Sequence, residues 1–309
     1  MTLSGPTTGP RKSRISAEEP VSGQSSIGDW LLWGKKKLSA LDEPERESRA
    51  LMSALLGSET SPWTRSKEAL DLGAARHYRD WINRRSNREP HHQITGQVTF
   101  FGRTFSVFPG VLIPRPETEH IVELALRHLA SRPSGSPPRI LDLGAGSGVI
   151  GISVLLEHPD AWGLAVEREP EALKVLIENR RRHGLSKRLT IVRGHWGEML
   201  AERPSFDCIL SNPPYVPEGE IASLAPEVRD HEPRSALDGG PDGLEPYRTI
   251  LPRALRLVRP GGLIALEIGD KIGNPSVFSE MAALPEGQEN LPTIIEDVSG
   301  RNRVVFWTR

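Results

Sequence analysis

Two short stretches of the sequence combine residue types and spacings that suit the transfer of a small group to a nitrogen atom. The first is Asn212-Pro-Pro-Tyr215, which lies just after the apolar run Cys208–Leu210. A planar amide or amine nitrogen is a poor nucleophile because its lone pair is delocalised, and it carries two N–H donors. The side-chain oxygen of Asn212 and the backbone carbonyl of Pro213 are two acceptors that can hold both hydrogens and orient the nitrogen.

The other residues of this motif suit the same chemistry. Pro213 and Pro214 stiffen the backbone and offer no competing N–H donor. Tyr215 presents a flat ring face to a planar substrate group. As the nitrogen gains positive charge the two acceptors also stabilise it, so no general base is required before transfer. A double proline that only ends a strand is the alternative, but it would not require asparagine before it or tyrosine after it.

The second stretch is a glycine-rich loop, Asp142-Leu-Gly-Ala-Gly-Ser-Gly148. Its glycines let the backbone turn tightly and let a ligand approach closely. The spacing Gly144-x-Gly146-x-Gly148 differs from the G-x-G-x-x-G of NAD enzymes. Asp142 suits a positively charged ligand, and Glu167, at the end of the next predicted strand, can accept both hydroxyls of a ribose. A purely structural turn with a solvent-facing Glu167 is the alternative.

S-adenosyl-L-methionine is a ligand of this kind, because it carries a ribose, a positively charged sulfonium and an amino group. The two stretches together therefore predict methyl transfer to a planar nitrogen. The methyl group would be displaced in line from the sulfonium, with catalysis arising mostly from orientation.

A parallel sheet must position these motifs. From residue 139 onward, short apolar runs alternate with helical segments, which predicts an α/β fold with helices on both faces of the sheet. The predicted strands are Ile140–Leu143, Gly163–Val166, Leu189–Val192, Cys208–Leu210 and Leu263–Leu266. Because parallel strands end at the same edge of a sheet, Asn212 should share a rim with Gly144 and Glu167. At the C-terminus, residues 294–295 and 304–307 have no helix between them, which predicts an antiparallel hairpin at the sheet edge.

The residues before this sheet predict three further regions. Residues 1–26 are rich in Ser, Thr, Gly and Pro, and we expect a disordered tail. Residues 27–95 are helical in pattern and form a small domain, with one helix ending at Gly57, a second around Ala69 and Leu72, and a third through Tyr78, Trp81 and Ile82. Residues 96–112 form a β-hairpin linker that turns at Gly102, and the catalytic domain spans 113–309, beginning with a helix over 117–130.

The composition narrows the class of protein. Hydrophobic residues make up 37% of the 309 residues, which suffices for a packed core, and the net charge of −1 argues against stable binding to long nucleic acid. The single cysteine, Cys208, indicates a reducing compartment. No apolar run approaches the roughly 20 residues that a membrane span needs. We expect a cytoplasmic monomer that has no metal site.

These motifs closely resemble those of the HemK/PrmC family, the peptide chain release factor glutamine methyltransferases. The resemblance covers about residues 27–309, and Asn-Pro-Pro-Tyr alone is shared with DNA adenine methyltransferases. Beyond the two stretches above, it is carried by Leu112-Ile-Pro-Arg-Pro-Glu-Thr-Glu119, Glu227-Val-Arg-Asp-His-Glu-Pro233, Ala236-Leu-Asp-Gly-Gly-Pro-Asp-Gly243, Pro260-Gly-Gly262 and Gly300-Arg-Asn-Arg303.

The resemblance implies a seven-stranded, Rossmann-like class I methyltransferase sheet and a small all-helical N-terminal domain that docks the substrate. The implied reaction is methylation of the glutamine in the Gly-Gly-Gln motif of class I release factors, giving N5-methylglutamine and aiding translation termination. The implied cofactor site holds Asp142, Gly144, Ala145, Gly146, Gly148, Glu167 and Asn212. The implied substrate site holds Arg115, Pro116, Glu117, Thr118, Asn212, Pro213 and Tyr215. A proline-stiffened helix start is a second interpretation of residues 115–119, and the two are compatible.

One position departs from the family. After the third strand the family usually has Asp or Ser near the adenine, whereas this chain has Gly194-His-Trp-Gly197. We align His195 with that position, because a neutral histidine can accept a hydrogen bond from the adenine amino group. Trp196 can pack against the adenine. A surface role for His195 is the alternative.

Three other functions compete with this interpretation. A glutamine methyltransferase for a ribosomal protein would have the same catalytic motif, so only the N-terminal domain and residues 112–119 discriminate. A DNA or RNA adenine methyltransferase would need a basic cleft and a target-recognition module, against which the near-neutral charge argues. A non-catalytic S-adenosylmethionine-binding protein would not need an intact Asn212–Tyr215 motif.

Overall fold

The structure is a computed structural model of the chain, and it describes residues 19–57, 61–132, 135–272, 274–281 and 292–309. The disordered tail was predicted over residues 1–26, and its residues 1–18 lie outside the described residues. For residues 19–26 the prediction was wrong at its end, because Ser26 caps α1 and the carbonyl of Ser25 accepts from the N–H of Leu70. The chain divides into two compact units, Met1–Thr95 and Gly96–Arg309, which are described one at a time below.

The N-terminal unit is helical. Its elements are α1 (Ile27–Lys37), α2 (Pro44–Leu56), the 3-10 helix η1 (Pro62–Arg65), α3 (Leu72–Ser86) and α4 (His91–Thr95). The prediction of separate helices around Ala69 and Tyr78 was wrong. Ala69 pairs with Ser26 in an isolated β-bridge, whereas Tyr78 lies in α3. The reason is Asp71, whose side chain accepts from the N–H groups of residues 73 and 74 and so starts the helix at residue 72.

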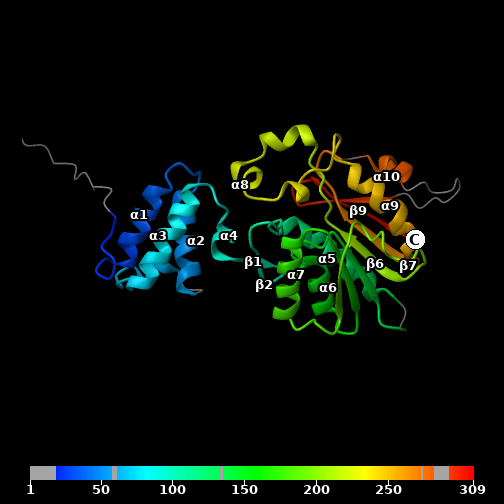
Figure 1. The fold of residues 1–309 in the computed structure, drawn as a ribbon, viewed down its shortest axis with the longest axis horizontal. Helices are drawn as coiled ribbons and strands as arrows, with labels where there is room; N and C mark the ends of the chain where they lie inside the picture. Colours follow the sequence, from blue (N-terminus) through cyan, green and yellow to red (C-terminus); the bar gives the residue numbers. More distant parts are fainter. Residues whose placement is uncertain (1–18, 58–60, 133–134, 273, 282–291) are drawn as a thin grey trace, which may run out of the picture. The chain divides into compact units, whose positions relative to one another are not determined.

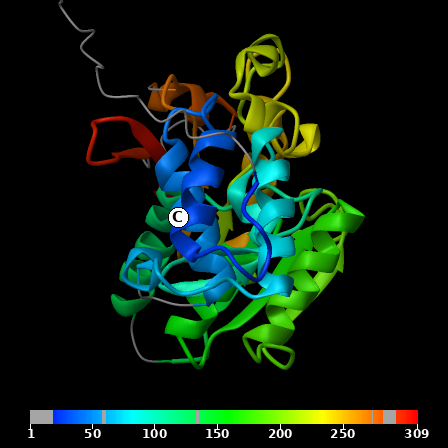
Figure 2. The ribbon, with the colours of Figure 1, turned by 90° about the vertical axis from the view of Figure 1, so that its left-hand side faces the viewer.

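Aromatic and aliphatic side chains together form the core of this unit, where the helices coloured blue to cyan pack together (Figure 1, Figure 2). The Trp30 ring meets Trp33 and Tyr78 edge-on, at centroid distances of 5.5 and 6.2 Å. The Tyr78 hydroxyl shares a 2.7 Å hydrogen bond with the hydroxyl of Ser48. Gly34 is required at this crossing, because a Cβ there would lie 2.6 Å from the Tyr78 hydroxyl.

The second unit contains a two-stranded hairpin and a seven-stranded sheet. The hairpin consists of β1 (Gln97–Phe100) and β2 (Arg103–Ser106), which confirms the predicted turn at Gly102. The sheet has the order β5-β4-β3-β6-β7-β9-β8. Its strands are β3 (Arg139–Leu143), β4 (Trp162–Glu167), β5 (Leu189–Arg193), β6 (Phe206–Ser211), β7 (Val258–Glu267), β8 (Thr293–Glu296) and β9 (Asn302–Thr308). Strands β3 to β7 are parallel, and β8 and β9 form the predicted antiparallel hairpin at the edge.

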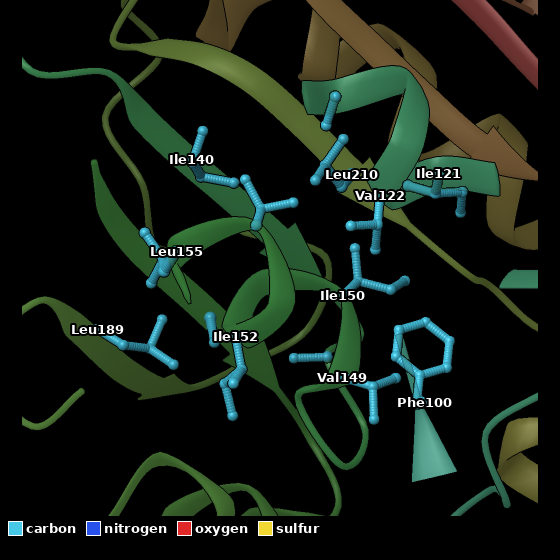
Figure 3. Close-up of a cluster of buried hydrophobic side chains, with 14 of the residues drawn as sticks. Phe100, Ile121, Val122, Ile140, Val149, Ile150, Ile152, Leu155, Leu189 and Leu210 are labelled. Atoms are coloured by element: carbon cyan, nitrogen blue, oxygen red, sulfur yellow. The ribbon is translucent and has the colours of Figure 1, made fainter. Parts of the chain in front are cut away.

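Helices cover both faces of this sheet, as the alternating pattern predicted. One face carries α5 (Glu119–Ala130), α6 (Val149–Glu157) and α7 (Pro170–Arg182). Figure 3 shows side chains of α5, α6 and the sheet, including Ile121, Ile150 and Leu210, packed into this core. The other face carries α9 (Glu245–Leu257) and α10 (Pro275–Met281). In the described part of the chain, no helix has both the length and the apolar content that crossing a membrane requires.

Short helical turns surround the carboxyl edge of the sheet. They are η2 (Pro116–Thr118), η3 (Glu218–Ser223), α8 (Pro226–Arg229) and η4 (Arg234–Ala236). The helix predicted over residues 117–130 therefore begins two residues late, because Pro116 starts a 3-10 turn that precedes α5.

Candidate active site

A pocket opens at the carboxyl edge of the parallel strands. Its wall contains Gly144 from the loop after β3, Glu167 from the end of β4 and Asn212 from the segment after β6. The structure thus brings these three predicted residues to one cavity. Its empty volume is about 870 Å³, open solvent at the mouth included.

The glycine-rich loop adopts backbone conformations that disfavour other residues. Gly144, Gly146 and Gly148 have φ angles of +66°, +56° and +83°. Gly144, Ala145 and Gly146 line the pocket, whereas Gly148 does not. A Cβ at Gly148 would lie 2.3 Å from the Leu176 side chain, so this glycine allows α6 and α7 to pack closely.

Backbone N–H groups fix the carboxylate of Glu167. Its Oε2 accepts from the N–H of Gly146 at 2.7 Å. Its Oε1 accepts from the N–H groups of Arg168 and Glu169 at 2.6 and 2.8 Å. The carboxylate thereby ties the end of β4 to the glycine-rich loop. Oε2 keeps a lone pair for a ligand hydroxyl, as the ribose prediction requires.

Asp142 lies deeper than the sequence pattern suggested. It is buried in β3 and does not line the pocket. Its Oδ2 accepts from the N–H of Gly151 at 2.9 Å, which anchors the first turns of α6 to the strand. Burial raises its pKa to about 7, and the nearby charge of Glu167 adds to the shift. The predicted direct contact between Asp142 and a ligand therefore has no support in the geometry.

His195 and Trp196 follow β5 and both line the pocket. Trp196 has a φ of +44°, a conformation that is unusual for a bulky residue. Its ring covers Gly144 so closely that a Cβ there would lie 2.7 Å from it. The two rings lie 5.5 Å apart between centroids. Their predicted contact with an adenine stays a prediction.

Asn212 is held by a chain of hydrogen bonds. Its Nδ2 donates to Oγ1 of Thr118 at 3.2 Å, and Oγ1 of Thr118 donates to Oε2 of Glu267 at 2.6 Å. The hydroxyl of Tyr215 donates to Oε1 of the same glutamate at 3.4 Å. Asn212, Pro214 and Thr118 line the main pocket, whereas Pro213 and Tyr215 do not.

A second pocket adjoins the first at Asn212. Its lining includes Arg115, Asn212, Tyr215 and Glu267. Neither lining includes Pro116, Glu117 or Pro213. Of the predicted substrate residues, those that reach a cavity are Arg115, Thr118, Asn212 and Tyr215. Asn212 thus lies where a ligand in one pocket would meet a ligand in the other.

Two buried carboxylates of the site were not predicted. Glu267 ends β7, and burial raises its pKa to about 7, while the hydrogen bonds from Thr118 and Tyr215 oppose that shift. Glu232 is paired with the guanidinium of Arg115, and burial raises its pKa as well. A signal for Glu267 existed, because an acidic residue at the end of an apolar strand is the pattern that singled out Glu167.

Comparison with known proteins identifies the family of the chain. Residues 29–96 match the family model for the PrmC N-terminal domain, and residues 118–228 match the Methyltransferase small domain. A Release factor glutamine methyltransferase of Caulobacter vibrioides is 39% identical over 271 residues, which are 87% of this chain and 91% of that protein. The chain belongs to the release factor glutamine methyltransferase family. Another member, from Nitratidesulfovibrio vulgaris, is 41% identical over 75% of this chain and 77% of its own length.

A solved structure supports the fold of this family member independently. The catalytic domain of hMettl16 in complex with MAT2A 3'UTR hairpin 6 superposes with a TM-score of 0.51 at 17% identity, covering 76% of this chain and 81% of that chain. At that identity the likeness concerns the fold alone. The predicted methyltransferase fold and the HemK/PrmC resemblance are both confirmed.

Proposed function

We propose that this protein transfers the methyl group of S-adenosylmethionine to the side-chain amide nitrogen of the glutamine in the Gly-Gly-Gln motif of a class I release factor. The observation that carries this proposal is the position of Asn212 at the junction of two pockets. One pocket suits a nucleoside cofactor, and the other suits a short side chain that reaches Asn212 from the opposite direction.

The main pocket fits S-adenosylmethionine chemically. The carboxylate of Glu167 suits the ribose hydroxyls, and the glycine backbone at 144–146 permits close approach of the cofactor. Val149 and Ile150 supply apolar wall, and we assign His195 and Trp196 to the adenine. When bound, the cofactor supplies an electrophilic methyl group on a sulfonium.

The residues of the chain do the orienting. Oδ1 of Asn212 and the carbonyl of Pro213 accept the two N–H bonds of the substrate amide, which directs its nitrogen toward the methyl group. The ring of Tyr215 packs beside the planar amide, and its position is held by the hydrogen bond to Glu267. As the nitrogen becomes positive, the same two oxygens stabilise that charge. The proton leaves to solvent after transfer.

The N-terminal unit has a separate role in this proposal. The helices of residues 27–95 dock the body of the release factor, in line with the match of residues 29–96 to the PrmC N-terminal domain. We place the reaction in the cytoplasm, where release factors act and where the buried thiol of Cys208 stays reduced.

The test is a labelling experiment. The purified protein is incubated with labelled S-adenosylmethionine and an unmodified class I release factor, and the label is located by peptide mass spectrometry. We expect label on the Gly-Gly-Gln glutamine, and none when that glutamine is changed to alanine or when the enzyme carries Asn212→Ala. Label on a ribosomal protein or on DNA, with none on the factor, would overturn the substrate.

A further inference from the structure

We propose that Thr118 and Glu267 are positioning residues that hold the amide of Asn212 with its oxygen facing the substrate. This inference rests on the proposed function. It adds two residues that act through Asn212 and do not touch the substrate nitrogen. The contacts are the 3.2 Å bond from Nδ2 of Asn212 to Thr118 and the 2.6 Å bond from Thr118 to Glu267.

The two ends of an asparagine amide have nearly the same shape but opposite hydrogen-bonding character. If the amide of Asn212 turned by 180°, its NH₂ group would face the substrate amide, which offers two donors of its own. The catalytic acceptor would be lost without any change in packing. Something other than shape must therefore select the orientation.

Glu267 makes that selection through the single proton of a hydroxyl. An ionised carboxylate is only an acceptor, so the proton of Thr118 must point to Glu267. The oxygen of Thr118 is then left as an acceptor toward Asn212. Only the NH₂ end of the amide can donate to it, which turns Oδ1 of Asn212 the other way.

The two positioning residues are anchored by the fold. Both are buried, with 2% of their surface exposed. The N–H of Thr118 donates to the carbonyl of Arg115 at 3.1 Å within the turn before α5. Glu267 lies in β7 between β6 and β9, and its carbonyl accepts from the hydroxyl of Tyr247 at 2.6 Å. These contacts fix the positions from which the two side chains act on the amide of Asn212.

The direction of these bonds depends on the charge of Glu267. A protonated Glu267 can donate to Thr118, which frees the Thr118 proton to face Asn212 and favours the turned amide. The groups that act on Glu267 are the hydroxyls of Thr118 and Tyr215, the cation of Arg303 and the anion of Glu117. Burial outweighs the favourable contacts and raises the pKa of Glu267 to about 7, so kcat should fall as the pH drops through that value.

The first experiment compares Thr118→Val, Thr118→Ser and a matched control, Thr249→Val, on the exposed face of α9. We measure kcat and KM with a release factor, and the affinity for S-adenosylhomocysteine by calorimetry. We expect Thr118→Val to lower kcat on the order of 10- to 100-fold, because the anchor of Asn212 is lost. Cofactor affinity should change by less than about 3-fold. Thr118→Ser should restore most of kcat, since it restores the hydroxyl.

The second experiment records the pH profile of kcat for the parent protein and for Glu267→Gln between about pH 6 and pH 9. The parent should lose activity toward acid, approaching 10-fold per pH unit well below the pKa. Glu267→Gln should be slower at alkaline pH and should lack the acid limb, because its amide does not titrate.

Three results would overturn the inference while leaving the proposed function intact. The first is a kcat of Thr118→Val equal to that of the parent. The second is a loss of kcat in Thr249→Val as large as that in Thr118→Val. The third is an acid limb that persists in the pH profile of Glu267→Gln. If the parent protein itself left the factor unmethylated, the proposed function would fail instead.

Discussion

Gly144→Ala tests whether the glycine-rich loop and Trp196 together shape the cofactor pocket. The substitution has two costs. At a φ of +66° an alanine is strained by roughly 1–2 kcal/mol. The new Cβ would also lie 2.7 Å from the Trp196 ring, against an ordinary contact of 3.4 Å, so the ring must move by about 0.7 Å (3.4 − 2.7). Overpacking of this kind costs about 1–3 kcal/mol.

Gly184→Ala is the matched control. Gly184 follows the end of α7 with a φ of +69°, and a Cβ there would have no neighbour within 4 Å. Gly184→Ala should therefore lose about 1–2 kcal/mol of unfolding free energy and bind cofactor like the parent. Gly144→Ala should lose about 2–5 kcal/mol and bind at least about 10-fold more weakly.

The assays are urea denaturation for stability and calorimetry with S-adenosylhomocysteine for affinity. The comparison of the two variants isolates the contact with Trp196, because both incur the same backbone strain. Parental affinity in Gly144→Ala would show that the position of the Trp196 ring does not matter to the cofactor.

Three further predictions concern stability, each measured by urea denaturation. Arg115→Ala should cost about 1–3 kcal/mol at pH 8, because Glu232 stays buried without its partner. Burial raises the pKa of Glu232, so the cost should shrink as the pH falls and protonation removes the unpaired charge. Tyr78→Phe should cost about 1–2 kcal/mol, since Ser48 loses the hydroxyl that bonds its side chain and carbonyl. Burial raises the pKa of Asp142 from 3.8 to about 7, so this carboxyl stabilises the fold below pH 4 and that contribution is lost as the pH rises through 7. Between pH 4 and pH 8 the unfolding free energy of Asp142→Asn should therefore rise by roughly 2–4 kcal/mol relative to that of the parent. If the difference in unfolding free energy between the two proteins were the same at both pH values, the burial argument would be contradicted.

Periodic patterns made most of the fold predictable. Each predicted strand of the parallel sheet exists, and the absence of a helix between residues 295 and 304 correctly indicated the antiparallel edge. The errors occurred where a single residue decides a helix boundary. Asp71 caps α3, so the helix begins at residue 72 and leaves Ala69 outside it, and Pro116 starts a 3-10 turn before α5. Apolar spacing carries no information about such local hydrogen bonds.

The site was harder to predict because its parts are far apart in the chain. Asn212 was found through its motif, but its hydrogen-bond partner Thr118 is 94 residues away, and Glu267 is 149 residues from Thr118. Spacing within a motif reports only on local geometry. The pairing of strands β6 and β7, with η2 at their carboxyl ends, is what brings these side chains together.

Three acidic residues at or near the ends of strands show why residue type alone does not assign a role. Asp142, Glu167 and Glu267 all belong to strands that lead to the pocket rim. Glu167 accepts three backbone N–H groups and faces the cofactor pocket. Asp142 accepts one and packs inward against α6. Glu267 accepts two side-chain hydroxyls, each of which belongs to a residue of the proposed substrate site. The donors around a carboxylate determine whether it binds a ligand, joins two elements or orients a neighbour, and those donors come from segments that only the folded sheet brings together.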